Sequence, residues 1–294
     1  MSGPPARGLL GKTAVTLEMV KVGHTLFALP FALCALFLAA GGWPGGRRFA
    51  LVVLAVLTLR AAAMAFNRLV DARIDARNPR TRSRALPAGR LTPAFAAGFA
   101  LACAGAFVAC AVAINALCGR LSPIALAVAL GYSYAKRFTA LSHLWLGAAL
   151  GISPLAAWVA VKGVVDSSCW IGGALAVAVL FWVAGFDLIY ACQDVDFDRR
   201  EGLKSLPARL GPRRALRLAA AFHALTLAAL WSAGRLAALD WKWNAAVVVV
   251  ALLLLLEHQI ADPSDPRRLE IAFFRVNAAI GPLLLAAVLL ELFP

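Results

Sequence analysis

Nine apolar stretches of membrane length run through this 294-residue chain and limit the folds that it can adopt. They lie near residues 23–42, 49–66, 93–115, 121–135, 142–162, 169–192, 215–234, 243–258 and 271–292. Hydrophobic residues make up 62% of the chain and charged residues 15%, a composition typical of bilayer proteins. A bilayer accepts helices or closed barrels, and these stretches are rich in Ala and Leu without the alternation of barrel strands. The sequence therefore predicts an all-α integral membrane protein with nine transmembrane helices, folded as a single domain over residues 1–294.

Lys and Arg are distributed unevenly over the connections between these stretches. The N-terminus and every second connection hold 21 basic residues, whereas the other four connections hold six. Because basic residues accumulate on the cytoplasmic side, we expect the N-terminus in the cytoplasm and the C-terminus outside. The net charge of +14 follows this pattern and forms no separate basic domain, so we predict no nucleic-acid binding. The first stretch exceeds the apolar core of a signal peptide, and we expect it to remain uncleaved.

Two of the stretches end in carboxylates that are spaced four residues apart. The first set is Asn67-Arg-Leu-Val-Asp71-Ala-Arg-Ile-Asp75, and the second is Asp194-Val-Asp196-Phe-Asp198. Positions i and i+4 of a helix lie on one face about 5–6 Å apart, where two carboxylates repel by roughly 3 kcal/mol at an effective dielectric constant of ~20. A helix that ends there adds the unfavourable negative end of its dipole. Such sets call for a hard divalent cation whose coordination is completed by substrate phosphates.

Basic residues follow both acidic sets, on the predicted cytoplasmic side. After the first set, Asn78-Pro79 should end the helix, because a residue before proline resists the α conformation, and an arginine-rich loop continues to residue 90. A divalent metal together with guanidinium groups binds a diphosphate well and stabilises it as a leaving group. Before the second set, Asp187 lies inside an apolar stretch, where it is costly unless it faces a polar cavity, and Tyr190 extends the same polar face.

The cysteines and histidines carry weaker signals. The six cysteines fall in or beside apolar stretches and form no CxxC or Cys/His cluster, so neither a zinc site nor a disulfide framework is indicated. His24, at the start of the first stretch, is either an interfacial structural residue or a contact to a polar substrate.

Taken in order, the motifs resemble those of a known family. The first acidic set resembles the NxxxDxxxD motif of the UbiA family of intramembrane aromatic prenyltransferases, and the other acidic set is similar to its DxxxD motif. Between them, the run Tyr132-Ser-Tyr134-Ala-Lys136-Arg137-Phe-Thr139 resembles the family's tyrosine-lysine-arginine segment. The regions around His24 and Asn67 are most similar to bacterial quinone-pathway members, which are 4-hydroxybenzoate polyprenyltransferases and the MqnP enzymes of the futalosine route to menaquinone.

The resemblance implies a UbiA-like bundle in a bacterial inner membrane, with a central cavity that is capped by two cytoplasmic acidic loops. It also implies two Mg²⁺ ions that bridge the carboxylates to a polyprenyl diphosphate. Asn67, Asp71 and Asp75 would form one metal site, and Asp194 and Asp198 the other. Asp196 falls on the opposite face of a regular helix, so its role is open. The basic positions that match the family near the diphosphate are Arg84, Lys136, Arg137 and Lys204.

The implied reaction transfers the polyprenyl group to the ring of a phenolic carboxylic acid in ubiquinone or menaquinone biosynthesis. The sequence leaves open whether the acceptor is of the 4-hydroxybenzoate or the 1,4-dihydroxynaphthoate type. It also does not choose whether Asp187, Tyr190 or a metal-free carboxylate oxygen takes the phenolic proton. The alternatives are a cation or proton transporter and another lipid-phosphate transferase. The prenyltransferase is favoured because the acids lie at the cytoplasmic ends of the spans and lack intervening glycines.

Overall fold

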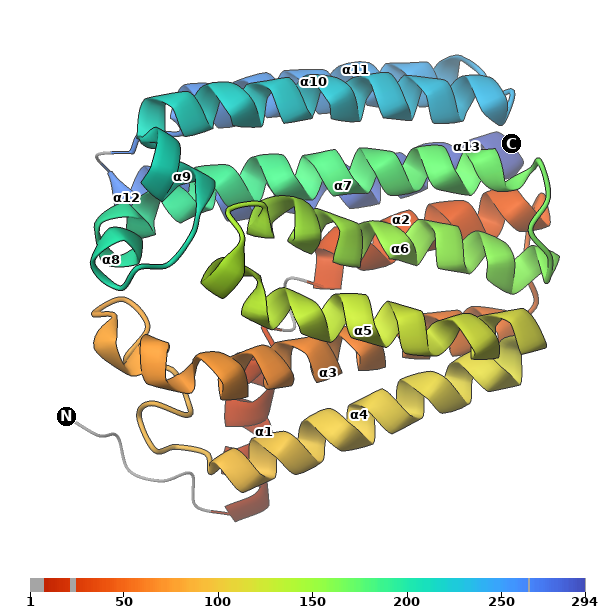
Figure 1. Cartoon of the computed structure of the whole chain (residues 1–294). Coiled ribbons are helices and arrows are strands. Elements are labelled where there is room, and N and C mark those ends of the chain that lie inside the picture. Colours follow the sequence, from red (N-terminus) through yellow and green to blue (C-terminus); the bar gives the residue numbers. More distant parts are fainter. Residues whose placement is uncertain (1–7, 22–24, 264, 294) are drawn as a thin grey trace.

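Long helices run side by side through the whole protein (Figure 1). The structure is a computed structural model that describes residues 8–21, 25–263 and 265–293, and no strand occurs in those ranges. His24 lies outside the described residues. The α-helices are α1 (Gly8–Met19), α2 (Thr25–Ala40), α3 (Gly46–Arg77), α4 (Pro93–Ile114), α5 (Ala116–Phe138), α6 (Ser142–Lys162), α7 (Cys169–Ala191), α8 (Val195–Arg200), α9 (Leu206–Leu210), α10 (Pro212–Leu236), α11 (Trp241–Ile260), α12 (Pro266–Ile271) and α13 (Asn277–Leu292).

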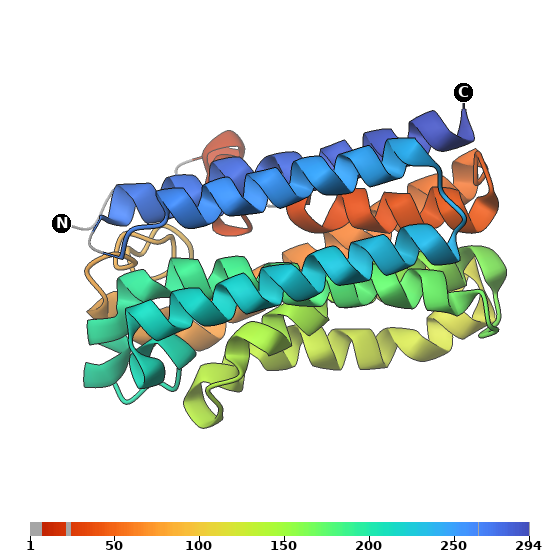
Figure 2. The same ribbon diagram turned by 90° about the horizontal axis from the view of Figure 1, so that it is seen from above.

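The predicted all-α membrane bundle is confirmed, but its count of nine spans is not. Within the described ranges, eight helices are long and apolar enough to cross a membrane. The first predicted span corresponds to α2, which has 16 residues and is shorter than the others. Viewed from above, the long helices remain side by side (Figure 2), whereas α1 lies across their direction.

Helix α3 carries the first acidic set beyond the apolar region. Its 32 residues span about 48 Å at 1.5 Å per residue, which exceeds the ~30 Å hydrocarbon core of a bilayer. The longer, apolar part therefore crosses the bundle, and the polar part from Asn67 to Arg77 lies at one end. The helix ends at Arg77 with Asn78 as its extended C-cap residue, as the Asn78-Pro79 pair predicts.

The two central helices, α6 and α7, pack very closely. A Cβ atom added to Gly147 would lie 2.1 Å from the Leu180 carbonyl oxygen, and one added to Gly151 would lie 2.7 Å from that of Ala176. Small residues four positions apart allow two membrane helices to bring their backbones together. This contact fixes α7, the most buried of the eight spans, in the middle of the bundle.

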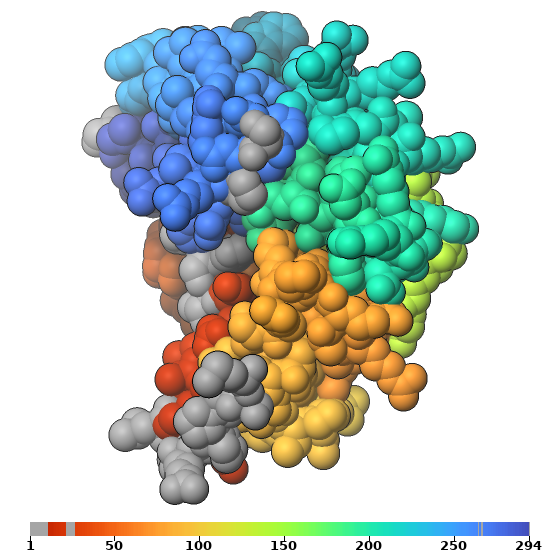
Figure 3. All heavy atoms as spheres, turned by 90° about the vertical axis from the view of Figure 1, so that its left-hand side faces the viewer, coloured from red at the N-terminus to blue at the C-terminus, as the bar shows by residue number. Residues whose placement is uncertain are grey.

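Both acidic sets lie at the same end of the bundle. Figure 3 looks onto that end and shows the loop that follows α3, in orange, beside the green and teal segment of α8 and α9. Helix α13 ends at the opposite end (Figure 1). The fold therefore brings together two segments that are more than 100 residues apart, as the hydrogen bond between Asn78 and Asp194 shows.

Candidate active site

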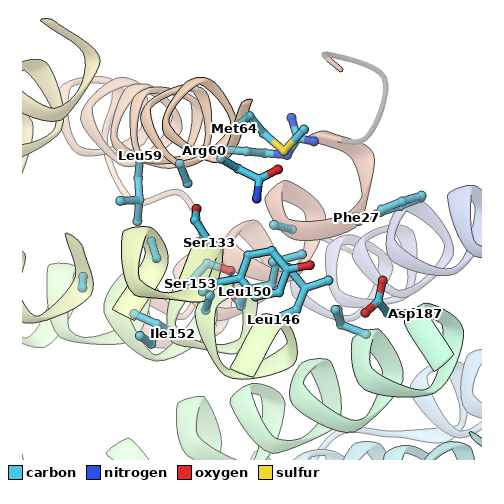
Figure 4. Close-up of a pocket in the computed structure, with 18 of the residues that line it drawn as sticks. Phe27, Leu59, Arg60, Met64, Ser133, Leu146, Leu150, Ile152, Ser153 and Asp187 are labelled. Carbon is cyan, nitrogen blue, oxygen red and sulfur yellow. Dashed lines mark hydrogen bonds between the residues drawn. The ribbon is translucent and has the colours of Figure 1, made fainter. Parts of the chain in front are cut away.

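A cavity of about 660 Å³ opens between α3, α5, α6 and α7. Its middle is lined mainly by apolar side chains such as Leu59, Leu146 and Leu150 (Figure 4). Its loop end is lined by the carboxylates of both acidic sets and by several basic residues. The cavity thus combines a charged end with an apolar interior, which suits a ligand with a charged head and a hydrocarbon tail.

The first set is held by hydrogen bonds from α3 itself, from α5 and from the loop after α3. Asn67 Nδ2 donates to Asp71 Oδ2 at 2.9 Å, and Arg137 Nη2 donates to Asp71 Oδ1 at 3.0 Å. Arg84 Nη1 donates to both oxygens of Asp75, at 2.8 and 2.9 Å. Arg68 contributes a more distant charge, with its Nη1 4.0 Å from Asp75 Oδ2. Each carboxylate of this set is therefore balanced by a guanidinium group.

The second set departs from the regular helix that the sequence suggests. Helix α7 ends at Ala191, a 3₁₀ turn spans Cys192–Asp194, and α8 then begins. This break places Asp194 and Asp198 around the first turn of α8, away from the unfavourable C-terminal end of α7. Asp194 and Asp198 are buried whereas Asp196 is exposed, so Asp196 does point away from its neighbours.

Asp194 accepts hydrogen bonds from the loop that follows α3. Arg80 Nε donates to Asp194 Oδ1 at 3.0 Å, Arg80 Nη2 donates to Oδ2, and Asn78 Nδ2 donates to Oδ1 at 3.2 Å. Burial by itself would lower the pKa of the Arg80 guanidinium, but its bonds to Asp194 raise that pKa above the usual value. Asp198 Oδ2 lies 3.7 Å from Lys136 Nζ. All four predicted metal-binding carboxylates thus have a basic partner.

Comparison with known proteins identifies the family. The sequence profile of the UbiA prenyltransferase family matches residues 28–279. The chain belongs to this family. It is 32% identical over 274 residues to 4-hydroxybenzoate octaprenyltransferase of Edwardsiella ictaluri (strain 93-146), covering 92% of each chain. It is also 32% identical over 274 residues to the enzyme of the same name from Nitrosomonas europaea, covering 92% of this chain and 90% of the relative.

Solved structures of UbiA homologs share the fold. The apo structure of a UbiA homolog from Aeropyrum pernix K1 is 33% identical, with a TM-score of 0.83, and covers 91% of this chain and 98% of that chain. A UbiA homolog from Archaeoglobus fulgidus, bound to GPP and Mg²⁺, is 20% identical with a TM-score of 0.67, over 93% of this chain and 99% of that chain. These comparisons confirm the resemblance that the three motifs indicate.

In this UbiA-family cavity, Asp187 and Tyr190 follow the wall of α7 inward from Asp194. The Tyr190 hydroxyl accepts a hydrogen bond from Arg80 Nη1 at 2.8 Å, and its ring centroid lies 4.3 Å from that of Phe273. Asp187 Oδ2 lies 2.6 Å from Nδ1 of His143, a fully buried residue of α6. Tyr190 is therefore tied to the charged end of the cavity, and Asp187 belongs to a separate pair deeper inside.

The structure brings ten of the eleven predicted site residues to the cavity wall. These residues are Asn67, Asp71, Asp75, Arg84, Lys136, Arg137, Asp187, Tyr190, Asp194 and Asp198. Lys204 is not among the residues that line the cavity, and its exposed ammonium donates to the Phe138 carbonyl oxygen at 3.2 Å.

Sequence reasoning missed several polar residues of this site, among them Asn78, Arg80 and His143. Arg80 and Asn78 lie in the predicted arginine-rich loop, but composition does not show which of its residues turn toward Asp194. His143 lies in an apolar stretch, with no motif around it, and its role becomes visible only when α6 packs against α7. The signal available for His143 was a lone titratable residue within a predicted span.

Proposed function

We propose that this protein transfers a polyprenyl group from a polyprenyl diphosphate to the ring of 4-hydroxybenzoate. The observation that carries the proposal is the convergence of four paired carboxylates, from α3 and from α7–α8, at the charged end of an apolar cavity. Relatives named 4-hydroxybenzoate octaprenyltransferase match 92% of the chain, which supports this acceptor over a dihydroxynaphthoate. The family provides no support for the transporter alternative.

We further propose that Asn67, Asp71 and Asp75 hold one Mg²⁺ ion and that Asp194 and Asp198 hold a second. The donor set fits, because it consists of carboxylate and amide oxygens, which Mg²⁺ prefers. Asp198 Oδ2 is buried and lies 3.7 Å from Lys136 Nζ, but it makes no hydrogen bond within the described part of the chain, so it can accept a metal. Within that part, no three acidic, His or Cys side chains are already gathered as a metal site, since each carboxylate is turned toward its basic partner.

The Arg and Lys side chains at the charged end can also bind the diphosphate when substrate is present. When bound by these carboxylates, Mg²⁺ would supply positive charge that stabilises the diphosphate as a leaving group. Arg80, Arg84, Lys136 and Arg137 lie at the same end of the cavity and can exchange a carboxylate oxygen for a phosphate oxygen. Such charge-assisted contacts stabilise the negative charge that develops on the departing diphosphate.

The deeper part of the cavity suits the prenyl tail and the acceptor ring. The walls formed by Leu146, Leu150 and Phe186 exclude water from the cation-like allylic carbon that forms as the C–O bond lengthens. Burial of the tail against such walls contributes roughly 0.8 kcal/mol per CH₂ group. Arg60 of α3 lines this region as well (Figure 4), and its positive charge matches the carboxylate of a hydroxybenzoate.

We also propose that the acidic end faces the cytoplasm of a bacterial inner membrane, with the end of α13 outside. The 21 basic residues on the acidic side, against six on the other, support this orientation. A cysteine introduced at Arg82 should react with a membrane-impermeant thiol reagent from the cytoplasmic side, and one at Arg47 from the outside. The reverse pattern would overturn the orientation.

The proposed activity can be tested with the purified full-length chain in lipid nanodiscs. We expect a radiolabelled polyprenyl diphosphate and 4-hydroxybenzoate to give a C-prenylated hydroxybenzoate in Mg²⁺ and none in excess EDTA. 1,4-Dihydroxynaphthoate in place of 4-hydroxybenzoate is the matched acceptor control. Prenylation of the naphthoate alone would move the proposal to menaquinone synthesis, and equal turnover in EDTA would contradict the metal site.

A further inference from the structure

One of the five acids that line the cavity has a partner unlike the others. Four carboxylates pair with Arg or Lys, whereas Asp187 pairs with His143. The four ion pairs are Asp71–Arg137, Asp75–Arg84, Asp194–Arg80 and Asp198–Lys136. An Arg or Lys partner places a permanent positive charge beside the carboxylate, whereas an imidazole engages it through a single ring nitrogen. Asp187 is therefore the cavity acid whose partner is an imidazole and not an Arg or Lys side chain.

Asp187 also lies at the depth where the acceptor ring belongs. It lies within α7, seven residues before Asp194, whereas Asp194 lies in the 3₁₀ turn beyond the end of that helix, so Asp187 lies farther from the charged end. On α3, Arg60 precedes Asn67 by the same seven residues, and Figure 4 shows Arg60 and Asp187 on different walls of the pocket. If the diphosphate occupies the charged end, its allylic carbon lies just inside, and the acceptor ring occupies the next layer, beside Asp187.

The contact with His143 orients this carboxylate. His143 Nδ1 lies 2.6 Å from Asp187 Oδ2, so one carboxylate oxygen is engaged by the ring and Oδ1 is left for a ligand. His143 is fully buried, and its Nε2 makes no hydrogen bond within the described residues. A buried polar pair with an unsatisfied nitrogen is expensive for a membrane protein. Packing alone would be served better by two apolar residues, which indicates that the pair has a function.

The remaining titratable groups near Asp187 already have other partners or positions. The Tyr190 hydroxyl accepts a hydrogen bond from Arg80 at the charged end. Tyr132 of α5 is partly buried, lines the cavity and interacts electrostatically with Asp187 and Asp71. On the other face of α7, His223 of α10 lies against Gly185 and is paired with His258. Of these groups, Asp187 presents the carboxylate that can meet an acceptor ring directly.

We propose that Asp187 is the catalytic base of prenyl transfer and that His143 is its positioning residue, an inference that rests on the proposed function. The allylic C–O bond breaks and its electron pair leaves with the diphosphate, while a π pair of the acceptor ring forms the new C–C bond. The C–H bond at that ring carbon then breaks, its electron pair restores the aromatic ring, and the proton goes to Asp187 Oδ1. Asp187 releases the proton to solvent as the product leaves.

The test compares acceptors with hydrogen and deuterium at the ring carbon that is prenylated. For Asp187→Asn we expect kcat to fall by about 10²–10⁴-fold, while KM for the prenyl diphosphate stays within twofold. A primary isotope effect that is small in the wild-type protein should appear in this variant, because proton loss becomes rate-limiting. His143→Leu should show the same two changes more weakly, and His143→Gln should restore part of kcat because its amide can still donate to Asp187.

Ser142→Ala is the matched control, because Ser142 is buried beside His143 on α6 and makes no side-chain hydrogen bond in the described structure. We expect it to keep kcat and to show no isotope effect. Unchanged kcat in Asp187→Asn, or a loss that appears mainly in KM for the diphosphate, would overturn the assignment. If Asp187→Asn does not fold, His143→Leu decides by the same criteria. Absence of product with the wild-type protein would instead refute the proposed function.

Discussion

The charged end of the cavity and the opposite face of α7 both bury carboxylates, but they balance them differently. At the charged end, each carboxylate is paired with an Arg or Lys side chain. Between α7, α10, α11 and α13, Glu257 is held by the neutral amide of Asn277, which donates to Glu257 Oε1 at 2.8 Å. We call this second group the Asn277 cluster. Its members are Trp182, His223, Glu257, His258 and Asn277.

The two groups also differ in whether a ligand can reach their polar side chains. The charged end lines a cavity, so its ion pairs are accessible to a ligand that enters it. Glu257 and Asn277 are fully buried, and the Trp182 indole nitrogen donates to Asn277 Oδ1 at 2.6 Å. Asn277 Nδ2 also donates to the carbonyl oxygens of Ala272 and Phe273, in a π-helical turn whose altered bonding leaves such oxygens available. The Asn277 cluster therefore supports the cavity wall at Phe273, whereas the charged end is where we propose that the chemistry takes place.

Single carboxylate substitutions should show the largest difference in activity between the charged end and the Asn277 cluster. We expect Asp71→Asn, Asp75→Asn, Asp194→Asn and Asp198→Asn each to lower kcat/KM by about a hundredfold to a thousandfold, because each removes a negative charge that would hold a metal ion beside the diphosphate. The proteins should remain folded, since the Asn side chain keeps the shape of Asp. The measurement is prenyl transfer at saturating Mg²⁺, with thermal unfolding in the same detergent.

The matched variant in the Asn277 cluster is Glu257→Gln. It keeps an oxygen that can accept from Asn277, so we expect activity to change by less than about twofold. Full activity in two of the Asp variants would contradict the metal site. A large loss of activity in a well-folded Glu257→Gln protein would show that the two groups are not functionally separate.

The basic residues should show a smaller and graded effect. Arg84→Gln and Lys136→Gln each remove one charge-assisted contact, so we expect activity to fall by about tenfold to a hundredfold. Arg47→Gln and Arg235→Gln lie at the other end of the bundle and should change activity by less than about twofold. Kinetics with varied prenyl diphosphate, at matched protein levels in membranes, would measure this.

Lys204 is the informative case within this series. Its match to the family's motif predicts a diphosphate contact, but its ammonium is bonded to the Phe138 carbonyl outside the cavity wall. From the geometry we expect Lys204→Gln to behave like Arg47→Gln. A tenfold loss would show that Lys204 moves to the diphosphate when substrate binds. An equal loss in all of the basic variants would mean that these residues only set topology.

Local rules predicted the features of this fold that depend on neighbouring residues. Apolar runs mark the spans, Asn78-Pro79 marks the end of α3, and the i, i+4 carboxylates mark the charged end of the cavity. The 3₁₀ turn at the end of α7 was not predicted. Asp194 of this turn is bonded to Arg80, which is 114 residues away in the sequence, and local rules do not identify such a contact.

The residues that the sequence missed depend on contacts between distant segments. Arg80 meets Asp194 across 114 residues, His143 meets Asp187 across 44, and Trp182 meets Asn277 across 95. Composition identifies an arginine-rich loop or a lone histidine in a span, but helix packing decides which partner each one meets. The close packing of α6 against α7 at Gly147 and Gly151 is an example, because it brings His143 beside Asp187.

The smallest effect on activity, with a large effect on stability, is expected from Asn277→Leu. The substitution leaves Glu257, the Trp182 indole and two π-turn carbonyls without their partner, which should lower the free energy of unfolding by about 3 kcal/mol or more. The folded fraction should retain most of its turnover, because Asn277 does not line the cavity.

Asn244→Ala is the control, since the Asn244 amide donates to a single exposed carbonyl oxygen and its loss should lower the free energy of unfolding only slightly. Thermal unfolding and specific activity of the folded protein would be measured together. Loss of turnover without loss of stability in Asn277→Leu would place the Asn277 cluster within the catalytic machinery and remove the distinction between the two groups.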